Sequence, residues 1–207
     1  MSRERIALLL HNARNRLASL CPGATPAQAA EMLGIAGQLS SAMALLRLGG
    51  SEPGLRREEV ELEVFFSDLM AEAARLSPAA LVTEGEADFS GNPFGSWVFD
   101  SQLIRVVLMD GLMNAWRHAR TKVRLEAGCQ GGELRFVIRD DGPGFPPAWL
   151  ATAGPGDAAR PKARGTGLGL ELARHIVGLH GTGPRAGRVE LANETEHGGA
   201  RLSIFLP

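Results

Sequence analysis

The feature that most constrains the fold is a strand-like run that ends in two acids and two glycines. Residues 133–139 alternate apolar and polar side chains, which is typical of a strand with one buried face. They lead directly into Asp140-Asp-Gly-Pro-Gly144, where glycine permits positive φ and proline fixes its own φ. A tight turn explains the glycines and the proline but does not require the acids. An acid at a strand end can also accept a hydrogen bond from a ligand that lies against bare backbone, and both interpretations stay open on these residues alone.

The composition argues against several classes of protein. A chain of 207 residues accommodates one α/β domain and a small helical part. Its 22 basic and 23 acidic residues give a net charge of −1, which provides no overall field for nucleic acid or an anionic membrane. Cys21 and Cys129 lie far apart with no Cys/His cluster nearby, so we expect neither a disulfide framework nor a thiolate metal site. The N-terminal apolar run is too short for a signal or a spanning segment, so we expect a cytoplasmic protein that carries no sensor region and does not insert into a membrane.

The first 50 residues predict an antiparallel helical hairpin. Two runs carry apolar side chains at heptad spacing on either side of a Pro- and Gly-containing breaker at residues 21–26. The first run contains Ile6, Leu10, Ala13, Leu17 and Leu20, and the second contains Met32, Ala36, Leu39, Met43 and Leu46. A lone hairpin leaves much of this apolar stripe in water, so we expect a homodimer in which two hairpins form a four-helix bundle.

The remaining chain predicts a linker at residues 51–59 and a mixed domain at residues 60–207. Asp100 is well placed as the N-cap of a helix that runs to His118. The other expected elements are helices at 63–76 and 168–180, strands at 80–89, 122–128, 133–139, 187–192 and 200–206, and a long loop at 146–164. This mixture of strands and helices predicts an α/β sandwich.

The helix that ends at His118 carries polar residues suited to a charged ligand. Asp110 and Asn114 are one turn apart and can face the same ligand. Asn114 is either a structural amide with a hydrogen-bond partner or an oxygen ligand for Mg²⁺, an ion that takes its other oxygens from water and phosphates. Arg117 and His118 would then approach those phosphates, or are simply solvated charges at the end of a helix.

A glycine-rich segment, Gly165-Thr-Gly-Leu-Gly-Leu170, opens the next helix. Free N–H groups at a helix N-terminus suit a polyphosphate, and a flexible hinge with close helix packing explains the same glycines. Lys162, in the preceding loop, either reaches the phosphates or is solvated.

In this order the three segments resemble the ATP-binding domain shared by histidine kinases, gyrase-type ATPases, heat-shock-90 chaperones and mismatch-repair ATPases, and the histidine-kinase branch matches best. Asp110-Gly-Leu-Met-Asn-Ala-Trp-Arg-His118 resembles the N box, Asp140-Asp-Gly-Pro-Gly-Phe145 the G1 box and Gly165–Leu170 the G2 box. The resemblance covers residues 61–207. It implies an α+β fold, in which the helical hairpin of residues 1–50 precedes an α/β sandwich of the Bergerat type.

The resemblance also implies ATP and Mg²⁺ as cofactors. Asn114 would bind Mg²⁺, with Asp110 as a further candidate ligand, and Asp140 would accept a hydrogen bond from the adenine amino group. The implied ATP-binding residues are Asn114, Arg117, His118, Asp140, Gly142, Gly144, Lys162, Gly165, Thr166, Gly167, Leu168 and Gly169.

The hairpin carries a fourth similar segment, His11-Asn-Ala-Arg-Asn-Arg-Leu17, which resembles the H box of the same family. It implies that His11 receives the γ-phosphoryl group and passes it to an aspartate on a response-regulator receiver domain, with Asn15 orienting a water for the reverse hydrolysis. Asn12 stands where the family usually has an acid, and an amide cannot accept the ring proton. A phosphotransfer scaffold that does not autophosphorylate and an anti-sigma-type serine kinase are the alternatives.

Overall fold

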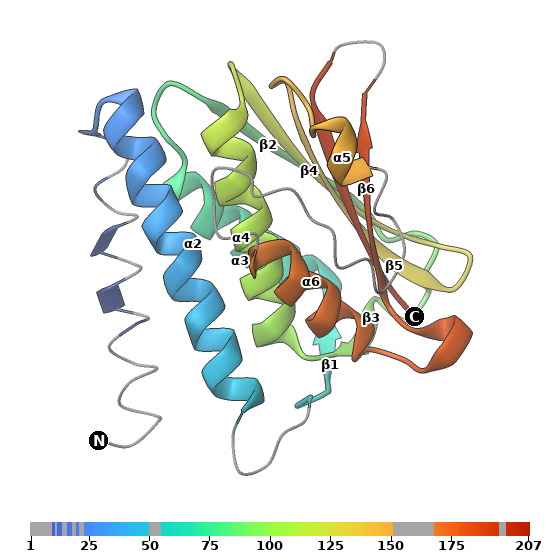
Figure 1. Ribbon diagram of the computed structural model, residues 1–207. Helices are drawn as coiled ribbons and strands as arrows, with labels where there is room; N and C mark the ends of the chain where they lie inside the picture. The colour runs from blue at the N-terminus through green and yellow to red at the C-terminus, as the bar shows by residue number, and fades with distance from the viewer. Residues whose placement is uncertain are drawn as a thin grey trace.

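The computed structural model describes residues 10, 12–13, 16–17, 20, 23–49, 55–150, 168–194 and 198–207 (Figure 1). Its centre is a five-stranded sheet in the order β2-β4-β5-β7-β6. Strands β2 and β4 are parallel, and the other pairs are antiparallel. The strands are β2 (Val82–Asp88), β4 (Lys122–Gln130), β5 (Glu133–Asp140), β6 (Arg188–Asn193) and β7 (Ala200–Leu206).

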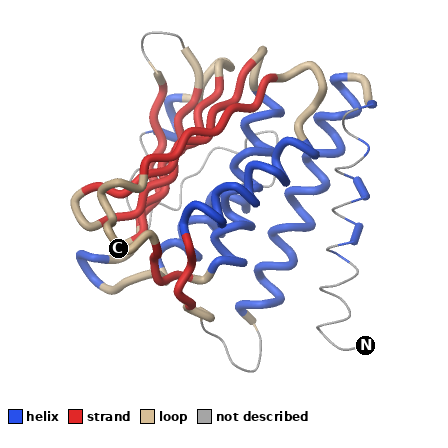
Figure 2. Tube along the Cα trace, turned by 180° about the vertical axis from the view of Figure 1, so that it is seen from behind, coloured by secondary structure: helices blue, strands red, loops and turns tan. Residues whose placement is uncertain are grey.

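The longer helices lie together on one face of this sheet, as Figure 2 shows from behind. They are α2 (Pro26–Leu48), α3 (Leu62–Leu76), α4 (Ser101–His118) and α6 (Leu168–Gly178). Short elements complete the described part of the chain: β1 (Glu58–Glu61) pairs with β3 (Ser96–Phe99), and α5 (Pro147–Leu150) and the 3-10 turn η2 (Gly183–Arg185) lie in connections. Among the described helices, none is both long enough and apolar enough to cross a membrane.

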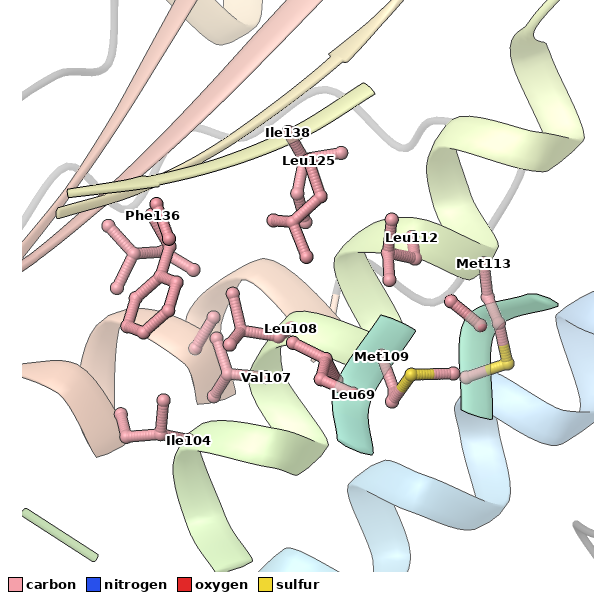
Figure 3. Close-up of a cluster of buried hydrophobic side chains, with 14 of the residues drawn as sticks. Leu69, Ile104, Val107, Leu108, Met109, Leu112, Met113, Leu125, Phe136 and Ile138 are labelled. Carbon is pink, nitrogen blue, oxygen red and sulfur yellow. The ribbon is translucent and has the colours of Figure 1, made fainter. Parts of the chain in front are cut away.

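Helix α4 is the central helix of the core. Its apolar side chains, including Ile104, Leu108 and Leu112, are fully buried, and they lie between the sheet residues Leu125 and Phe136 and the neighbouring helices (Figure 3). Because these side chains recur every three or four residues, one broad face of α4 is withdrawn from water while the opposite face remains free for polar residues.

The start of α4 is fixed by the predicted cap, which is confirmed. Asp100 Oδ1 accepts a hydrogen bond from the Leu103 N–H at 3.0 Å, and Oδ2 accepts one from the Arg56 N–H at 2.9 Å. The Asp100 N–H itself donates to His180 Nε2 at 3.1 Å, while His180 Nδ1 lies 2.9 Å from the Ile176 carbonyl. These contacts require a neutral ring that carries its proton on Nδ1, so His180 connects the end of α6 to the start of α4.

Helix α2 packs directly on α4 and α6 and shares their core. Leu33, Ala36 and Ala44 are buried, and the equally buried Ser40 hydroxyl donates to the Ala36 carbonyl at 3.1 Å. Ala36 belongs to the predicted apolar run, whereas Leu33, Ser40 and Ala44 do not. The hairpin partner of α2 and the four-helix bundle stay predictions.

Four details differ from the sequence prediction. Strand β1 begins at Glu58, inside the predicted linker, and β3 was not expected at all. Helix α6 ends at Gly178, two residues before the predicted end at residue 180, and α5 lies in a segment predicted as a loop. The wider division into residues 1–50, 51–59 and 60–207 stays a prediction.

Candidate nucleotide-binding site

The first acid of the predicted G1 box lies at the end of β5 with its side chain almost completely buried. Asp140 is 9% exposed, and its Oδ1 accepts hydrogen bonds from the Gly142 N–H at 2.8 Å and the Ala200 N–H at 3.3 Å. Burial raises the pKa of Asp140, and these two N–H groups together with nearby His118 partly offset that rise. Both bonds end on Oδ1, so Oδ2 keeps acceptor capacity for a ligand.

The second acid of the G1 box, Asp141, has a structural role. Asp141 accepts backbone hydrogen bonds from Arg120 at 2.8 Å, from Thr121 at 3.0 Å and from Lys122 at 3.2 Å, and it also accepts from the Thr121 hydroxyl. Although some desolvation opposes the effect, these donors hold the pKa of Asp141 well below its usual range. Asp141 therefore ties the turn between α4 and β4 to the G1 segment, whereas Asp140 accepts both of its hydrogen bonds on a single oxygen.

The glycines that follow are required by close approach. A Cβ on Gly142 would collide with the His118 carbonyl oxygen, so the end of the N box and the G1 segment touch backbone to backbone. Gly144 has a φ of +81°, a conformation that favours glycine. A Cβ there would come within 2.8 Å of the Asn193 side chain.

Asn193 contacts the G1 segment, and this contact was not predicted from the sequence. Its Oδ1 accepts from the Phe145 N–H at 2.7 Å, and its Nδ2 donates to the Phe145 carbonyl at 2.9 Å. In the sequence Asn193 only opens the turn that follows a predicted strand, so no local pattern indicates this contact over 48 residues.

Asp110 of the N box lies on the side of α4 that faces α2 and α6. Asn114 is exposed, and Asp110, one turn earlier, lies between Gly37 of α2 and Gly169 of α6. A Cβ on Gly37 would come within 2.8 Å of Asp110 Oδ1, and one on Gly169 would collide with Oδ2. Although part of its surface reaches solvent, this packing desolvates the carboxylate and raises the pKa of Asp110 to about 6, against the opposing effect of Arg117. The structure thus brings the N box and the end of the G2 box together.

Two basic residues end the N box, Arg117 and His118. The guanidinium of Arg117 packs against α2, where a Cβ on Gly34 would lie 3.2 Å from Nη2, and its buried Nε has no hydrogen-bond partner within the described part of the chain. Burial and the Arg117 charge lower the pKa of His118, while Asp140 opposes that shift. Contact of either residue with phosphates stays a prediction.

Several predicted site residues lie outside the described residues. They are His11, Asn15, Lys162, Gly165, Thr166 and Gly167. Leu168 starts α6, and Gly169 is the G2 residue whose surroundings are described.

The polar groups on α4 fit a magnesium ion. The Asn114 amide and the Asp110 carboxylate are oxygen donors one turn apart, and Mg²⁺ is commonly held by one or two protein oxygens plus phosphates and waters. In the described ranges no group of three or more His, Cys, Asp or Glu side chains could hold a metal alone, so an ion here would need oxygens from the nucleotide.

A surface cavity of about 410 Å³ lies away from these residues. It is lined by Gln130, Glu133, Arg135, Arg188 and Phe205. Arg188 is paired with Glu133 and Glu190, and it lies 3.8 Å from the centre of the Phe205 ring. The cavity therefore lies apart from the Asp140 site, and its Arg188 is already paired with two glutamates.

Helices cover one face of the sheet, and a buried acid with bare glycine backbone lies at the end of one strand. The central helix carries an acid and an amide. These features are those of a nucleotide-binding domain. Residues 99–207, just over half of the chain, match the family described as "Histidine kinase-, DNA gyrase B-, and HSP90-like ATPase". The chain belongs to this ATPase family, and the resemblance inferred from the three boxes is confirmed.

Curated relatives agree with the histidine-kinase branch. The chain is 31% identical over 112 residues to the signal transduction histidine-protein kinase AfsQ2 of Streptomyces coelicolor, covering 52% of this chain and 20% of that protein. It is 34% identical over 114 residues to the sensor histidine kinase component HK1 of Mycobacterium tuberculosis, covering 52% of this chain and 62% of that protein. The chain thus spans less than two thirds of the length of either relative.

Solved structures show the same fold. Full-length ShkA in complex with AMPPNP matches 100% of this chain and 46% of its own, with a TM-score of 0.61 and 22% identity. The catalytic domain of the histidine kinase ThkA matches 73% of this chain and 97% of its own, with a TM-score of 0.55 and 19% identity. A histidine-kinase type of ATP-binding domain is therefore established for the second half of the chain.

Proposed function

We propose that this chain is a histidine kinase of two-component signalling that binds Mg-ATP and transfers the γ-phosphoryl group to His11. The observation that carries the proposal is Asp140, whose Oδ1 is held by two backbone N–H groups while Oδ2 keeps acceptor capacity beside Gly142. An acceptor fixed in this way selects a base that offers an amino group, which distinguishes adenine from a base that offers a carbonyl at that position.

The phosphate end of the nucleotide would lie along α4 toward the start of α6. Gly169 meets the Asp110 carboxylate there, and Asn114 is exposed one turn further on. N–H groups at the start of α6 would bind phosphate oxygens, and Asn114 with Asp110 would hold Mg²⁺. A bound Mg²⁺ neutralises charge on the phosphates.

The acceptor in this proposal is the hairpin of residues 1–50. A neutral imidazole nitrogen of His11 would attack the γ-phosphorus, the bond to the ADP oxygen would break, and the ring would release a proton. Asn12 is exposed and helical in the structure, and its amide cannot take that proton, so the proton would pass to solvent. We propose a homodimer through the hairpins, onward transfer to a receiver-domain aspartate, a role for Asn15 in the reverse hydrolysis, and a cytoplasmic location.

The exposed amide at Asn12 also favours a second candidate, a phosphotransfer scaffold without autokinase activity. Such a protein would take phosphate onto His11 from a phosphorylated receiver domain and would not need ATP. Calorimetric titration with ATP, with and without Mg²⁺, followed by incubation with γ-labelled ATP separates the two.

Acid-labile label that disappears in His11→Gln, while nucleotide affinity is unchanged, supports the kinase. Asn114→Ala should remove the Mg²⁺-dependent part of the affinity at unchanged stability, because the side chain is exposed. Nucleotide binding without label would favour the scaffold, and label that persists in His11→Gln would refute the acceptor.

A further inference from the structure

The end of β6 makes an unusual contact with the G1 segment. Asn193 hydrogen-bonds to both backbone groups of Phe145, accepting from its N–H at 2.7 Å and donating to its carbonyl at 2.9 Å. A side-chain amide paired with the N–H and C=O of one residue replaces a neighbouring strand, so it fixes the backbone there without a sheet ladder.

The residue before Phe145 is shaped to admit this amide. Gly144 has a φ of +81°, and a Cβ at that position would come within 2.8 Å of Asn193 Cγ and Oδ1. A side chain at residue 144 would therefore be strained and would also displace the amide. Gly144, the second glycine of the G1 box, thus leaves space for the Asn193 side chain as well as for the adenine base proposed above.

The connection between β6 and β7 also holds the other end of the same segment. The Ala200 N–H donates to Asp140 Oδ1 at 3.3 Å, and a Cβ on Gly199 would collide with the Asp140 carbonyl oxygen. Residues 140–145 are therefore held at one end by Asn193, the last residue of β6, and at the other by Ala200, the first residue of β7.

After Phe145 the chain continues into α5, and an aromatic pair links the two. The rings of Phe145 and Trp149 are stacked, with centroids 6.5 Å apart and planes inclined by 9°. The backbone of Phe145 is thus fixed by Asn193 while its ring supports α5, the last described element before residue 151.

We propose that Asn193 is a positioning residue of the nucleotide site, holding Phe145 so that residues 140–144 keep the conformation that presents Asp140 to the adenine base. This inference rests on the proposed ATP-binding function. Asn193 is solvent-exposed, so its removal should affect the shape of the G1 segment more than the stability of the fold.

The chain offers a matched control in Asn92. Its Nδ2 donates to the Ser96 carbonyl at 2.6 Å and its Oδ1 accepts from the Phe94 N–H at 3.0 Å, so it braces the loop at residues 90–95 with the same chemistry. Asn193→Ala and Asn92→Ala remove comparable bonds, one pair at the G1 segment and the other in a loop that contributes no proposed nucleotide contact.

The test measures Kd for ATP and for inosine triphosphate, which lacks the amino group, in the wild type and both variants. Asn193→Ala should weaken ATP binding about tenfold or more and lower the preference for ATP over inosine triphosphate, whereas Asn92→Ala should leave both unchanged. Asn193→Asp, which keeps the acceptor but loses the donor, should be intermediate. Wild-type affinity and wild-type base preference in Asn193→Ala would overturn the inference.

A second readout needs no nucleotide. Amide hydrogen exchange of residues 140–149 should become faster in Asn193→Ala and stay as in the wild type in Asn92→Ala. If the wild type binds no ATP, the proposed function fails, and the inference, which rests on it, fails with it. If the wild type binds ATP but exchange in this segment is the same in all three proteins, the proposed function stands and the inference alone fails.

Discussion

Thr121 donates both its backbone N–H and its hydroxyl to Asp141, and so joins the turn after α4 to the G1 segment. The two adjacent acids therefore differ in kind: Asp141 supports the local fold, while Asp140 keeps an oxygen for a ligand. This difference separates the effects that substitutions at the two positions should have.

Asp141→Asn should lower stability near neutral pH by about 1–2 kcal/mol, because an amide accepts these hydrogen bonds more weakly than a carboxylate. The folded-state pKa of Asp141 lies below its ordinary value, so its contribution is present above the ordinary carboxyl pKa and is lost as pH falls through the folded pKa. The difference between wild type and variant, measured by urea unfolding, should therefore shrink as pH falls below about 4. Glu86→Gln, an exposed control on β2, should change stability by less than about 0.5 kcal/mol at any pH. A pH-independent difference at Asp141 would contradict this assignment.

His180 should make the fold sensitive to mild acid. Burial lowers the pKa of His180, so the folded state favours the neutral ring that accepts from the Asp100 N–H. Stability should be unaffected above the ordinary histidine pKa of about 6.5 and should fall as pH decreases from there toward the lower folded pKa. Unfolding of wild type and His180→Gln at pH 7.5 and at pH 5.5 should show a larger loss in the wild type. His175→Gln, at an exposed position on α6, should behave as the wild type does.

Asp140→Asn should weaken ATP binding about 10- to 100-fold, because an amide can present a donor to the adenine amino group where the carboxylate only accepts. Calorimetry at pH 7.5 measures the effect directly. Asp141→Asn is the comparison, since it should lower stability while leaving the ATP affinity of the folded protein within about threefold. Equal loss of affinity in both variants would mean that the two acids do not have separate roles.

Gly37→Val should lower stability by about 1–3 kcal/mol, the usual cost of overpacking a close contact. The reason is that a Cβ at Gly37 would already lie within 2.8 Å of Asp110 Oδ1. Gly23→Ala is the control, because a Cβ there meets no atom within 4 Å. Urea unfolding measures the free energy of unfolding of both variants. An unchanged free energy of unfolding in Gly37→Val would show that α2 is not held against α4 in solution.

The parts of the fold that sequence predicted are those with a strong local signal. The cap at Asp100, the apolar period of α4 and the alternation of β4 and β5 each depend on residues close together in the chain, so pattern and structure agree. The order of the N, G1 and G2 segments likewise indicated the family, which the match over residues 99–207 confirms.

The parts that were missed depend on contacts between distant residues. Strand β1 is acidic and four residues long, so it carries no hydrophobic alternation from which a strand could be inferred. Where α2 meets the N box, its contact residues are Gly34 and Gly37, which contribute nothing to an apolar pattern. The link from Asn193 to Phe145 appears only when β6 is placed beside the G1 segment.

The two glycines of α2 that face the N box have a mechanical consequence. Gly34 lies against the Arg117 guanidinium and Gly37 against the Asp110 carboxylate, and neither contact leaves spare volume. Helix α2 therefore cannot rotate about its axis or slide along α4 without pushing one of these two charges. A rotation of α2 would therefore displace the charges of Arg117 and of Asp110, the acid that we propose as a ligand of the nucleotide's Mg²⁺.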